Sequence, residues 1–189
     1  MHVAERTSEI LEAACRVICV RGSDRLRMSD VAREAGVSSA LVHYYFETRA
    51  DLLARAFRHA DERVDAYVER QLIRCTTPRE RLETVLATYL SDDETVEQSF
   101  ILWAEMLRHA IYDVSTRTMV ADAYRAWIAG VAVHLEASGL ADAEPAATRL
   151  CALVDGLGEQ MLVRDLAFEQ ARDLVREAIA NELRAGLAE

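Results

Sequence analysis

The sequence predicts an all-α protein in which a small N-terminal unit precedes a larger helical body. Apolar residues recur at three- and four-residue intervals along most of the 189 residues, as on the buried faces of amphipathic helices. Only two prolines and seven glycines interrupt them, and 51% of the residues are apolar. No apolar run is long enough to cross a bilayer, and the first ten residues lack the apolar core of a signal peptide. We therefore expect a cytoplasmic protein without a membrane partner.

Charge is distributed unevenly along the chain. The net charge is −10, and all 22 basic residues are arginine. Residues 1–58 hold nine arginines against eight acidic residues, whereas the remainder holds thirteen against twenty-four. This asymmetry favours an N-terminal part that can approach a polyanion and an acidic, solvated body.

The first helix is expected over residues 3–20, with Gly22 as its stop. Its inner stripe consists of Leu11, Ala14, Cys15 and Ile18. Cys15 and Cys19 lie four residues apart and share a helix face. The pair is either a thiol sensor, half of a metal site, or two small buried hydrophobes. Because no nearby His or acidic residue completes a ligand set, the sequence favours buried hydrophobes.

Residues 28–46 have the layout of two short helices joined by a tight turn. The small apolar residues of the first helix share one face and are Val31, Ala32 and Ala35. Gly36 suits the left-handed conformation that ends this helix, and Ser38 is a good N-cap for a second helix reaching about Phe46. In a helix-turn-helix, this second helix enters the DNA major groove.

The second helix has a composition that suits contact with DNA. No acidic residue occurs in residues 35–46, although Asp and Glu are frequent elsewhere. Ser39, His43 and Tyr44 offer hydrogen-bonding groups to a base edge or a phosphate. Ala40 permits close approach to a phosphate or a thymine methyl group. This helix is therefore the predicted DNA-reading element.

Residues 30–53 resemble the DNA-binding signature of TetR-type (tetracycline-repressor-like) transcriptional regulators and read DVAREAGVSSALVHYYFETRADLL. The resemblance implies groove-facing side chains at Ser39, Ala40, His43 and Tyr44, and phosphate contacts at Tyr45, Thr48 and Arg49. The full set of predicted DNA-binding residues is Arg27, Ser29, Ser38, Ser39, Ala40, His43, Tyr44, Tyr45, Thr48 and Arg49.

Two residues depart from the family pattern. Leu41 stands where the family often has Thr or Asn, and His43 stands where Tyr is commoner. Both departures bear on the operator sequence rather than on the fold. Two alternatives stay open: Tyr45 is a core aromatic residue, or His43 and Tyr44 belong to a solvated face.

The next helix is predicted to bridge the N-terminal unit and the body. Thr48 is its expected N-cap, with Asp51 at the third position, and it continues to about Gln71. Arg27 stands where the family usually has a capping Thr. An arginine cannot accept a backbone N–H, so we expect capping of the earlier helix to pass to Ser29 and Arg27 to contact phosphate.

Helix starts and stops divide the body. Thr77-Pro78-Arg79-Glu80 combines an N-cap, Pro at the first helical position and a capping box. Ser91 and Glu94 repeat the capping-box spacing before a helix to about Ala110. A further helix spans about residues 115–137 and ends at Ser138-Gly139.

Two amphipathic helices end the chain: Pro145 opens the first, and the second follows Arg164-Asp165. Such helices expose an apolar face unless something covers it. In TetR-type regulators the corresponding pair forms a four-helix bundle with a second subunit, which implies a homodimer. The expected dimerisation residues are Leu150, Leu153, Leu157, Leu174, Val175, Ala178 and Ile179. We divide the chain into a DNA-binding domain, residues 1–47, and a ligand-binding and dimerisation domain, residues 48–189.

The resemblance also implies a ligand pocket inside the body. The expected lining residues are Tyr67, Tyr89, Phe100, Trp103, Met106, Tyr124, Trp127 and Met161. The alternative is that these side chains simply fill the core. Polar candidates to orient a ligand are Glu105, His109, His134 and Glu159. The body segment WAEMLRHA, together with Asp155-Gly156-Leu157, resembles the betaine-regulator-like branch of the family, whose ligands are diverse.

The sequence thus predicts a homodimeric repressor that binds a palindromic operator in double-stranded DNA and is released by a small-molecule effector. Two recognition helices about 34–36 Å apart read such a palindrome. The alternative is a TetR-like helical sensor without specific DNA binding. An enzyme is not expected, because no Ser-His-Asp elbow, Gly-rich phosphate loop or metal-spaced cluster occurs. No cofactor or metal is expected.

Overall fold

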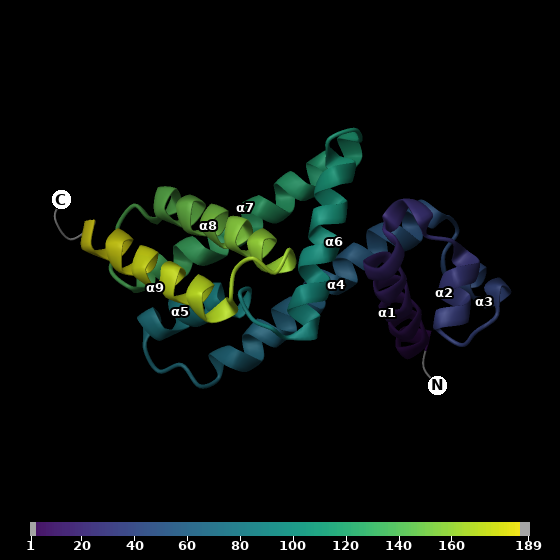
Figure 1. Ribbon diagram of the computed structural model, residues 1–189, viewed down its shortest axis with the longest axis horizontal. Coiled ribbons are helices and arrows are strands. Elements are labelled where there is room, and N and C mark those ends of the chain that lie inside the picture. The colour runs from purple at the N-terminus through teal and green to yellow at the C-terminus, as the bar shows by residue number, and fades with distance from the viewer. Residues whose placement is uncertain (1–2, 186–189) are drawn as a thin grey trace.

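The computed structural model describes residues 3–185, and in this range all regular structure is helical. The molecule is elongated, with a head at one end and a body at the other (Figure 1). The head comprises α1 (Val3–Arg21), the 3-10 turn η1 (Ser23–Arg25), α2 (Met28–Glu34) and α3 (Ser39–Tyr45). The rest comprises α4 (Arg49–Leu72), α5 (Pro78–Thr88), α6 (Glu94–Ala110), α7 (Val114–Ala137), α8 (Ala143–Leu162) and α9 (Phe168–Ala185). Within residues 3–185, no helix has the length and hydrophobicity needed to cross a membrane.

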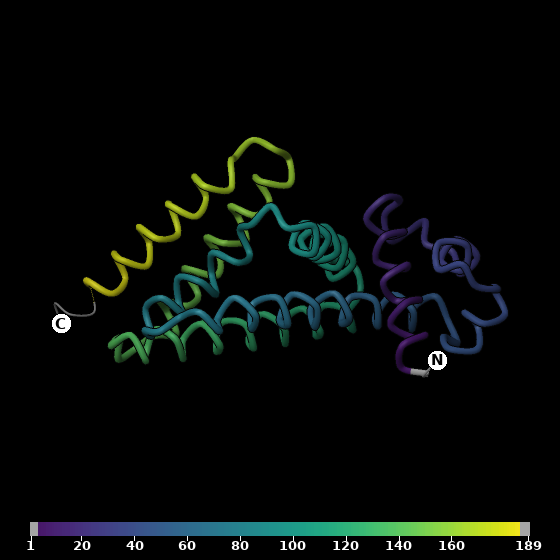
Figure 2. Tube along the Cα trace, turned by 90° about the horizontal axis from the view of Figure 1, so that it is seen from below, coloured from purple at the N-terminus to yellow at the C-terminus, as the bar shows by residue number. Residues whose placement is uncertain are grey.

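Two hydrophobic cores meet along α4. The first core joins α1, α2 and α3 to the first half of α4, and it also includes Leu102, Met106 and Ala110 of α6 and Val120 of α7. The second core begins at Val64 of α4 and unites the remaining body helices. Figure 2 shows α6 nearly end-on, between the head and the other body helices. The head is therefore packed against the body through α6 as well as through α4.

Most predicted helix starts are confirmed. The Ser38 hydroxyl accepts a hydrogen bond from the Leu41 N–H at 3.2 Å, and the Thr48 hydroxyl accepts one from the Asp51 N–H at 3.0 Å. At the start of α5, the capping box between Thr77 and Glu80 is complete. These bonds satisfy N–H groups that the first turn of a helix leaves without partners.

Two predicted caps are wrong. Arg27 is the N-cap of α2 without any side-chain cap bond, and Ser29 lies within the helix. Helix α6 begins at Glu94 and is capped by Asp93, whose carboxylate accepts the Thr95 N–H at 2.8 Å. Ser91 therefore lies ahead of the cap, because the acidic residue directly before the helix reaches its free N–H groups.

The predicted turns at Gly36 and Gly139 are confirmed. Their φ angles are 66° and 100°, a region in which glycine carries no Cβ penalty. The predicted break at Arg164-Asp165 is also present, and Arg164, with φ 62°, follows the end of α8. A single left-handed residue after the helix redirects the chain toward α9.

The predicted dimerisation face requires a correction. Leu150, Leu157, Val175 and Ile179 are at most 5% exposed, because they pack in the second core of their own subunit. They hold α8 and α9 on the body and are not available to a partner. Of the other predicted residues, Leu153 and Ala178 are half-buried and Leu174 is 42% exposed. For these three, contact with a second subunit remains a prediction.

Candidate functional site

Helix α3 presents a fixed surface to solvent. Ser39, Ala40 and His43 are exposed, and the Tyr44 side chain is 79% exposed. On the opposite face, Val42 and Phe46 are fully buried. Because the buried face holds the helix in the first core, the exposed residues share one outward-facing surface. At the C-terminal end of α3, Phe46 is therefore the buried aromatic residue, and the exposed Tyr44 can contact another molecule.

The end of α3 is attached to α4. Arg55 donates a hydrogen bond to the Tyr45 carbonyl at 3.0 Å, and its guanidinium lies 4.4 Å from the centre of the Phe46 ring. Tyr45 is half-buried against the first core, and its ring meets that of Tyr44 edge-on at 5.2 Å. The sequence left open whether Tyr45 is a core aromatic residue or a surface residue. In the structure one part of its side chain packs on the core and the other part is exposed.

The remaining predicted DNA-binding residues lie in α2, in the turn before α3 and at the start of α4, or next to them. Arg27, Ser29, Ser38, Thr48 and Arg49 are all exposed. Arg49 also has a role that the sequence did not reveal, since its guanidinium donates to the Leu26 carbonyl at 3.0 Å and to the Ser23 carbonyl. It thereby fixes the chain between η1 and α2. Its contact with DNA phosphate remains a prediction.

A polar cluster connects the head to α6. Ser23 is fully buried, and the Glu105 carboxylate accepts hydrogen bonds from its N–H, at 2.8 Å, and from its hydroxyl. Arg108 pairs with Asp24 at 2.9 Å and with Glu105 at 3.2 Å. The His109 ring nitrogen lies 2.7 Å from the Ser23 hydroxyl. Burial opposes ionisation of Glu105, but the bonds from Ser23 and Arg108 outweigh it and lower the pKa of Glu105.

The position of this cluster shows that part of the prediction about polar ligand-orienting residues is wrong. Glu105 and His109 do not reach the body cavity; they hold η1 on α6. Glu159 is exposed and also lies outside the cavity lining, whereas His134 lines the cavity. Sequence periodicity could not place Glu105, because its partner Ser23 is 82 residues away.

The body contains a cavity of about 450 Å³ between α4, α5, α6, α7 and α8. Its aromatic wall consists of Tyr89, Phe100, Trp103, Tyr124 and Trp127. Ring centres of Trp103 and Tyr124 lie 5.1 Å apart in an edge-on arrangement, and those of Tyr89 and Trp127 lie 5.4 Å apart. The indole N–H of Trp127 is buried and has no hydrogen-bond partner among residues 3–185. It can donate to a polar group of a ligand.

Four carboxylates also line the cavity, and none of the described lining residues is an arginine. The four carboxylates belong to Asp61, Asp65, Glu69 and Asp155. Burial, followed by repulsion from Asp65 and Glu62, raises the pKa of Asp61 to about 6. Burial and then Glu69 raise the pKa of Asp65, while burial raises that of Asp155 against the hydrogen bond from the Tyr124 hydroxyl, 2.7 Å long. The acidic side chains give the cavity lining a negative charge at neutral pH, and the raised pKa values show that this charge is unfavourable without a cationic partner.

The cavity contains five of the eight predicted ligand-binding residues. Tyr67 lines a different cavity, on another face of α4. Met106 is buried in the first core, and Met161 packs against the second; neither lines either cavity. The acidic residues were missed, although the four-residue spacing of Asp61, Asp65 and Glu69 places like charges on one helix face, which is unfavourable without a cationic partner.

Cys15 lies in the first hydrophobic core, and the half-buried Cys19 packs against that core. Cys15 is fully buried and donates a weak hydrogen bond to the Ala56 carbonyl at 3.4 Å. Burial raises the pKa of the Cys15 thiol to about 12 and that of Cys19 to about 11. Both groups are therefore protonated at neutral pH, and a reactive thiolate is disfavoured.

The structure combines a helix-turn-helix, whose exposed second helix is α3, with a helical body that contains a cavity. This combination is typical of transcriptional regulators that bind DNA with one part and a ligand with the other. The chain belongs to the tetR family: residues 10–56 match the family model for bacterial regulatory proteins of the tetR family. Residues 78–184 match the model for the C-terminal part of BetI-type transcriptional repressors. The predicted all-α fold and family resemblance are confirmed.

Individual relatives agree with this assignment. The chain is 31% identical to a TetR-family transcriptional regulator from Rhodococcus sp., with 96% and 100% of the two chains covered and a TM-score of 0.83. It is 29% identical to a transcriptional regulator from Saccharomonospora viridis in complex with choline, with 94% and 96% covered and a TM-score of 0.82. The BetI regulator from Agrobacterium fabrum is 35% identical over 117 residues, which are 61% of this chain and 56% of that regulator. Another BetI relative, from Brucella anthropi, is matched over 59% of its length.

Proposed function

We propose that this protein is a homodimeric, ligand-responsive repressor whose body cavity binds a small organic cation and whose α3 binds a palindromic operator. The observation that carries the ligand class is the cavity lining, whose described residues include four carboxylates and five aromatic side chains but no arginine. Aromatic faces attract organic cations, most strongly when water is excluded. The choline complex of the Saccharomonospora viridis regulator supports a quaternary ammonium compound as the ligand.

The signal would pass from the cavity to the head through α6. Phe100 and Trp103 line the cavity, and Glu105, on the same helix, binds η1 through Ser23. A ligand that displaces Trp103 would move Glu105 with it, because a helix transmits displacement over one turn as a rigid body. The head would then leave its DNA-binding orientation. A coupling free energy of about 1–3 kcal/mol would change operator affinity roughly 5- to 150-fold.

Titration with choline tests both parts of the proposal. We expect choline to quench the fluorescence of Trp103 and Trp127 saturably, and to release an operator duplex obtained by selection from a random library. Sodium chloride at the same ionic strength is the control. If choline and other quaternary ammonium compounds leave both signals unchanged, the proposed ligand class is wrong. If choline binds but no duplex is enriched, the protein is instead a sensor without specific DNA binding.

Two substitutions on the predicted DNA-binding surface should change DNA binding in different ways. His43→Ala removes a groove-facing side chain and is expected to change which duplex sequences are enriched. Arg27→Ala removes a phosphate contact, so it should weaken binding to all duplexes alike and reduce the salt dependence of log K by about 1. Sequencing of selected duplexes and binding at several salt concentrations would measure these effects. If His43→Ala enriches the same duplexes as the unmodified protein and Arg27→Ala binds them with unchanged affinity and salt dependence, the assigned DNA contacts are wrong.

Cation affinity should depend on pH. Asp61, Asp65, Glu69 and Asp155 face the ligand, and the only basic group in the described lining is His134, whose pKa is lowered by burial. Acidification below the raised pKa of Asp61, about 6, neutralises a carboxylate, and protonation of His134 adds positive charge. Both effects oppose a cation. Choline affinity should therefore fall from about pH 7.5 to about pH 5.5, by at most roughly tenfold per pH unit for each carboxylate that titrates. The neutral isostere 3,3-dimethylbutanol should show no such loss.

A further inference from the structure

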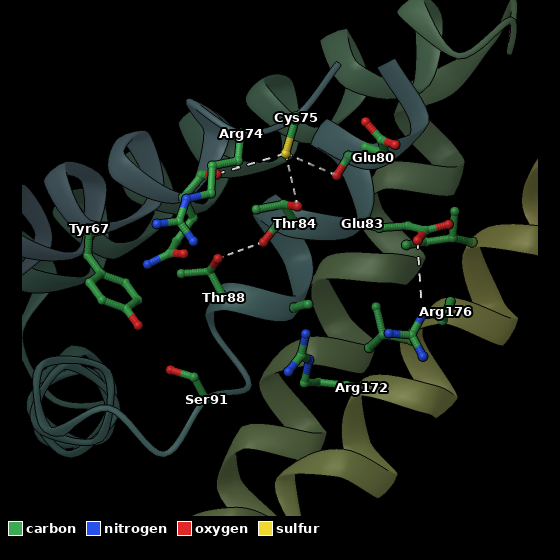
Figure 3. Close-up of a pocket in the computed structure, with 14 residues that line it drawn as sticks. Tyr67, Arg74, Cys75, Glu80, Glu83, Thr84, Thr88, Ser91, Arg172 and Arg176 are labelled. Atoms are coloured by element: carbon green, nitrogen blue, oxygen red, sulfur yellow. Dashed lines mark hydrogen bonds and ion pairs between the residues drawn. The ribbon is translucent and has the colours of Figure 1, made fainter. Parts of the chain in front are cut away.

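A second cavity, of about 430 Å³, lies on another face of α4, between α4, α5 and α9 (Figure 3). Its charge is opposite in character to that of the first cavity. Three arginines line it: Arg74, just after α4, and Arg172 and Arg176 of α9. Nothing in the proposed repressor mechanism uses these residues.

The two acidic residues of this lining are already engaged. Glu80 accepts hydrogen bonds from Thr76 and Thr77 in the capping arrangement, and these bonds lower the pKa of Glu80. Glu83 pairs with Arg79 at 2.9 Å and with Arg176 at 4.0 Å. Among the described residues, Arg74 and Arg172 have no acidic partner within 4.0 Å. Two guanidinium groups therefore remain uncompensated.

Two buried polar atoms also lack partners here. The Arg172 Nε and the Ser91 Oγ are shielded from solvent, yet neither makes a hydrogen bond within the described part of the chain. A buried donor without an acceptor is unfavourable, and more so when it is charged. In Figure 3 the Arg172 guanidinium and the Ser91 hydroxyl lie on the side of the cavity opposite Arg74. Tyr67 adds a phenol from α4.

We propose that this second cavity binds a small oxyanion, either a carboxylate or a phosphate ester. Arg172 and Arg74 would supply the positive charge, and the Arg172 Nε–H and the Ser91 hydroxyl would donate hydrogen bonds to its oxygens. Guanidinium groups match the geometry of both carboxylate and phosphate oxygens. The volume leaves room for an organic substituent beside the charged group.

The position of the cavity has a regulatory consequence. Tyr67 and Gln71 of α4 line the second cavity, which we call the anion cavity. Asp65 and Glu69 of the same helix line the first cavity, which we call the cation cavity. Both ligands would therefore act on one helix, whose first turn carries Arg49 beside the head. The two ligands should change each other's affinity by the same factor, because binding linkage is reciprocal.

Calorimetric titration of the full chain with inorganic phosphate and, separately, with succinate tests the site. The background is chloride at constant ionic strength. We expect saturable binding of at least one of the two anions, and the more tightly bound one distinguishes a phosphate from a carboxylate ligand. Arg172→Gln should weaken that binding at least about tenfold. The matched control is Arg125→Gln on α7, which removes an exposed guanidinium outside the cavity and should change nothing.

Ser91→Ala provides a second variant that keeps all charges, with an expected loss of about threefold to tenfold. Choline binding should survive in Arg172→Gln, which would show that the body is intact. The proposal is overturned if neither anion binds saturably above the chloride background, or if Arg172→Gln and Ser91→Ala bind like the unmodified protein. These outcomes are independent of whether choline binds to the first cavity.

Discussion

Replacing both Asp61 and Asp65 by Asn should weaken choline binding by about 2–3 kcal/mol, which is roughly a 30- to 150-fold loss. Each carboxylate lies in the cavity wall, and attraction to a cation a few ångströms away is worth a few kcal/mol at the effective dielectric of a protein. The two substitutions preserve the size of the side chains, so the aromatic wall should stay in place. Tryptophan fluorescence would measure the affinity of the variant.

The same variant should be more stable than the unmodified protein when no ligand is present. Burial raises the pKa of both groups in the folded chain. An acid whose pKa is higher in the folded than in the unfolded state loses stability as pH rises, so at pH 7 its ionisation disfavours folding. Removing the charges removes this cost. Urea unfolding at pH 7 would measure the gain.

A matched double variant separates cavity charge from total charge. Asp92→Asn/Asp122→Asn removes two exposed carboxylates outside the cavity lining. It should leave choline affinity within about twofold, because exposed charges are screened by water and salt. If both double variants lose the same affinity, or if neither does, the acidic wall does not hold the ligand.

Gly158→Ala should destabilise the protein and constrict the cation cavity. An added Cβ at Gly158 would lie 2.2 Å from two atoms of the Phe100 ring, so the ring has to move. Phe100 lines the cavity, and its displacement is expected to reduce the space for a ligand. Overpacking of this kind costs about 1–3 kcal/mol. Urea unfolding and choline titration would measure the two effects.

Gly156→Ala is the matched control on the same helix. A Cβ at Gly156 would meet no atom within 4 Å, so alanine brings only its better helix propensity, worth up to about 1 kcal/mol. The two variants are therefore expected to change stability in opposite directions. Equal stability changes at the two positions would show that the Phe100 ring does not pack on Gly158, and unchanged choline affinity in Gly158→Ala would place the ligand elsewhere.

The cavity shows why helix periodicity in the sequence identified only part of the ligand site. Aromatic residues on the inner faces of helices were predicted to line a pocket, and the prediction was right for Tyr89, Trp103 and Trp127 but wrong for Met106. A buried face looks the same in sequence whether it meets another helix or an open space. Only the packing of five helices distinguishes the two.

The sequence by itself determined the local structure and the class of protein. The caps at Ser38 and Thr48, the turn at Gly36 and the exposed face of α3 depend on residues within a few positions of one another. Such signals are complete in a short segment, because the groups that satisfy a helix end belong to its own first or last turn. The reading helix could therefore be placed almost to the residue.

The tertiary structure decided everything that depends on distant segments. It joined Ser23 to Glu105, gave Arg49 its carbonyl partners and buried Leu150 and Ile179 in their own subunit. It also placed the acidic residues of one α4 face beside the aromatic wall, and left a second face of α4 lining the arginine-rich cavity. These contacts join residues that are tens of positions apart in the sequence. They form only because whole helices pack against one another. A residue's own helix periodicity shows that it faces inward, but the neighbouring helices determine what it meets there.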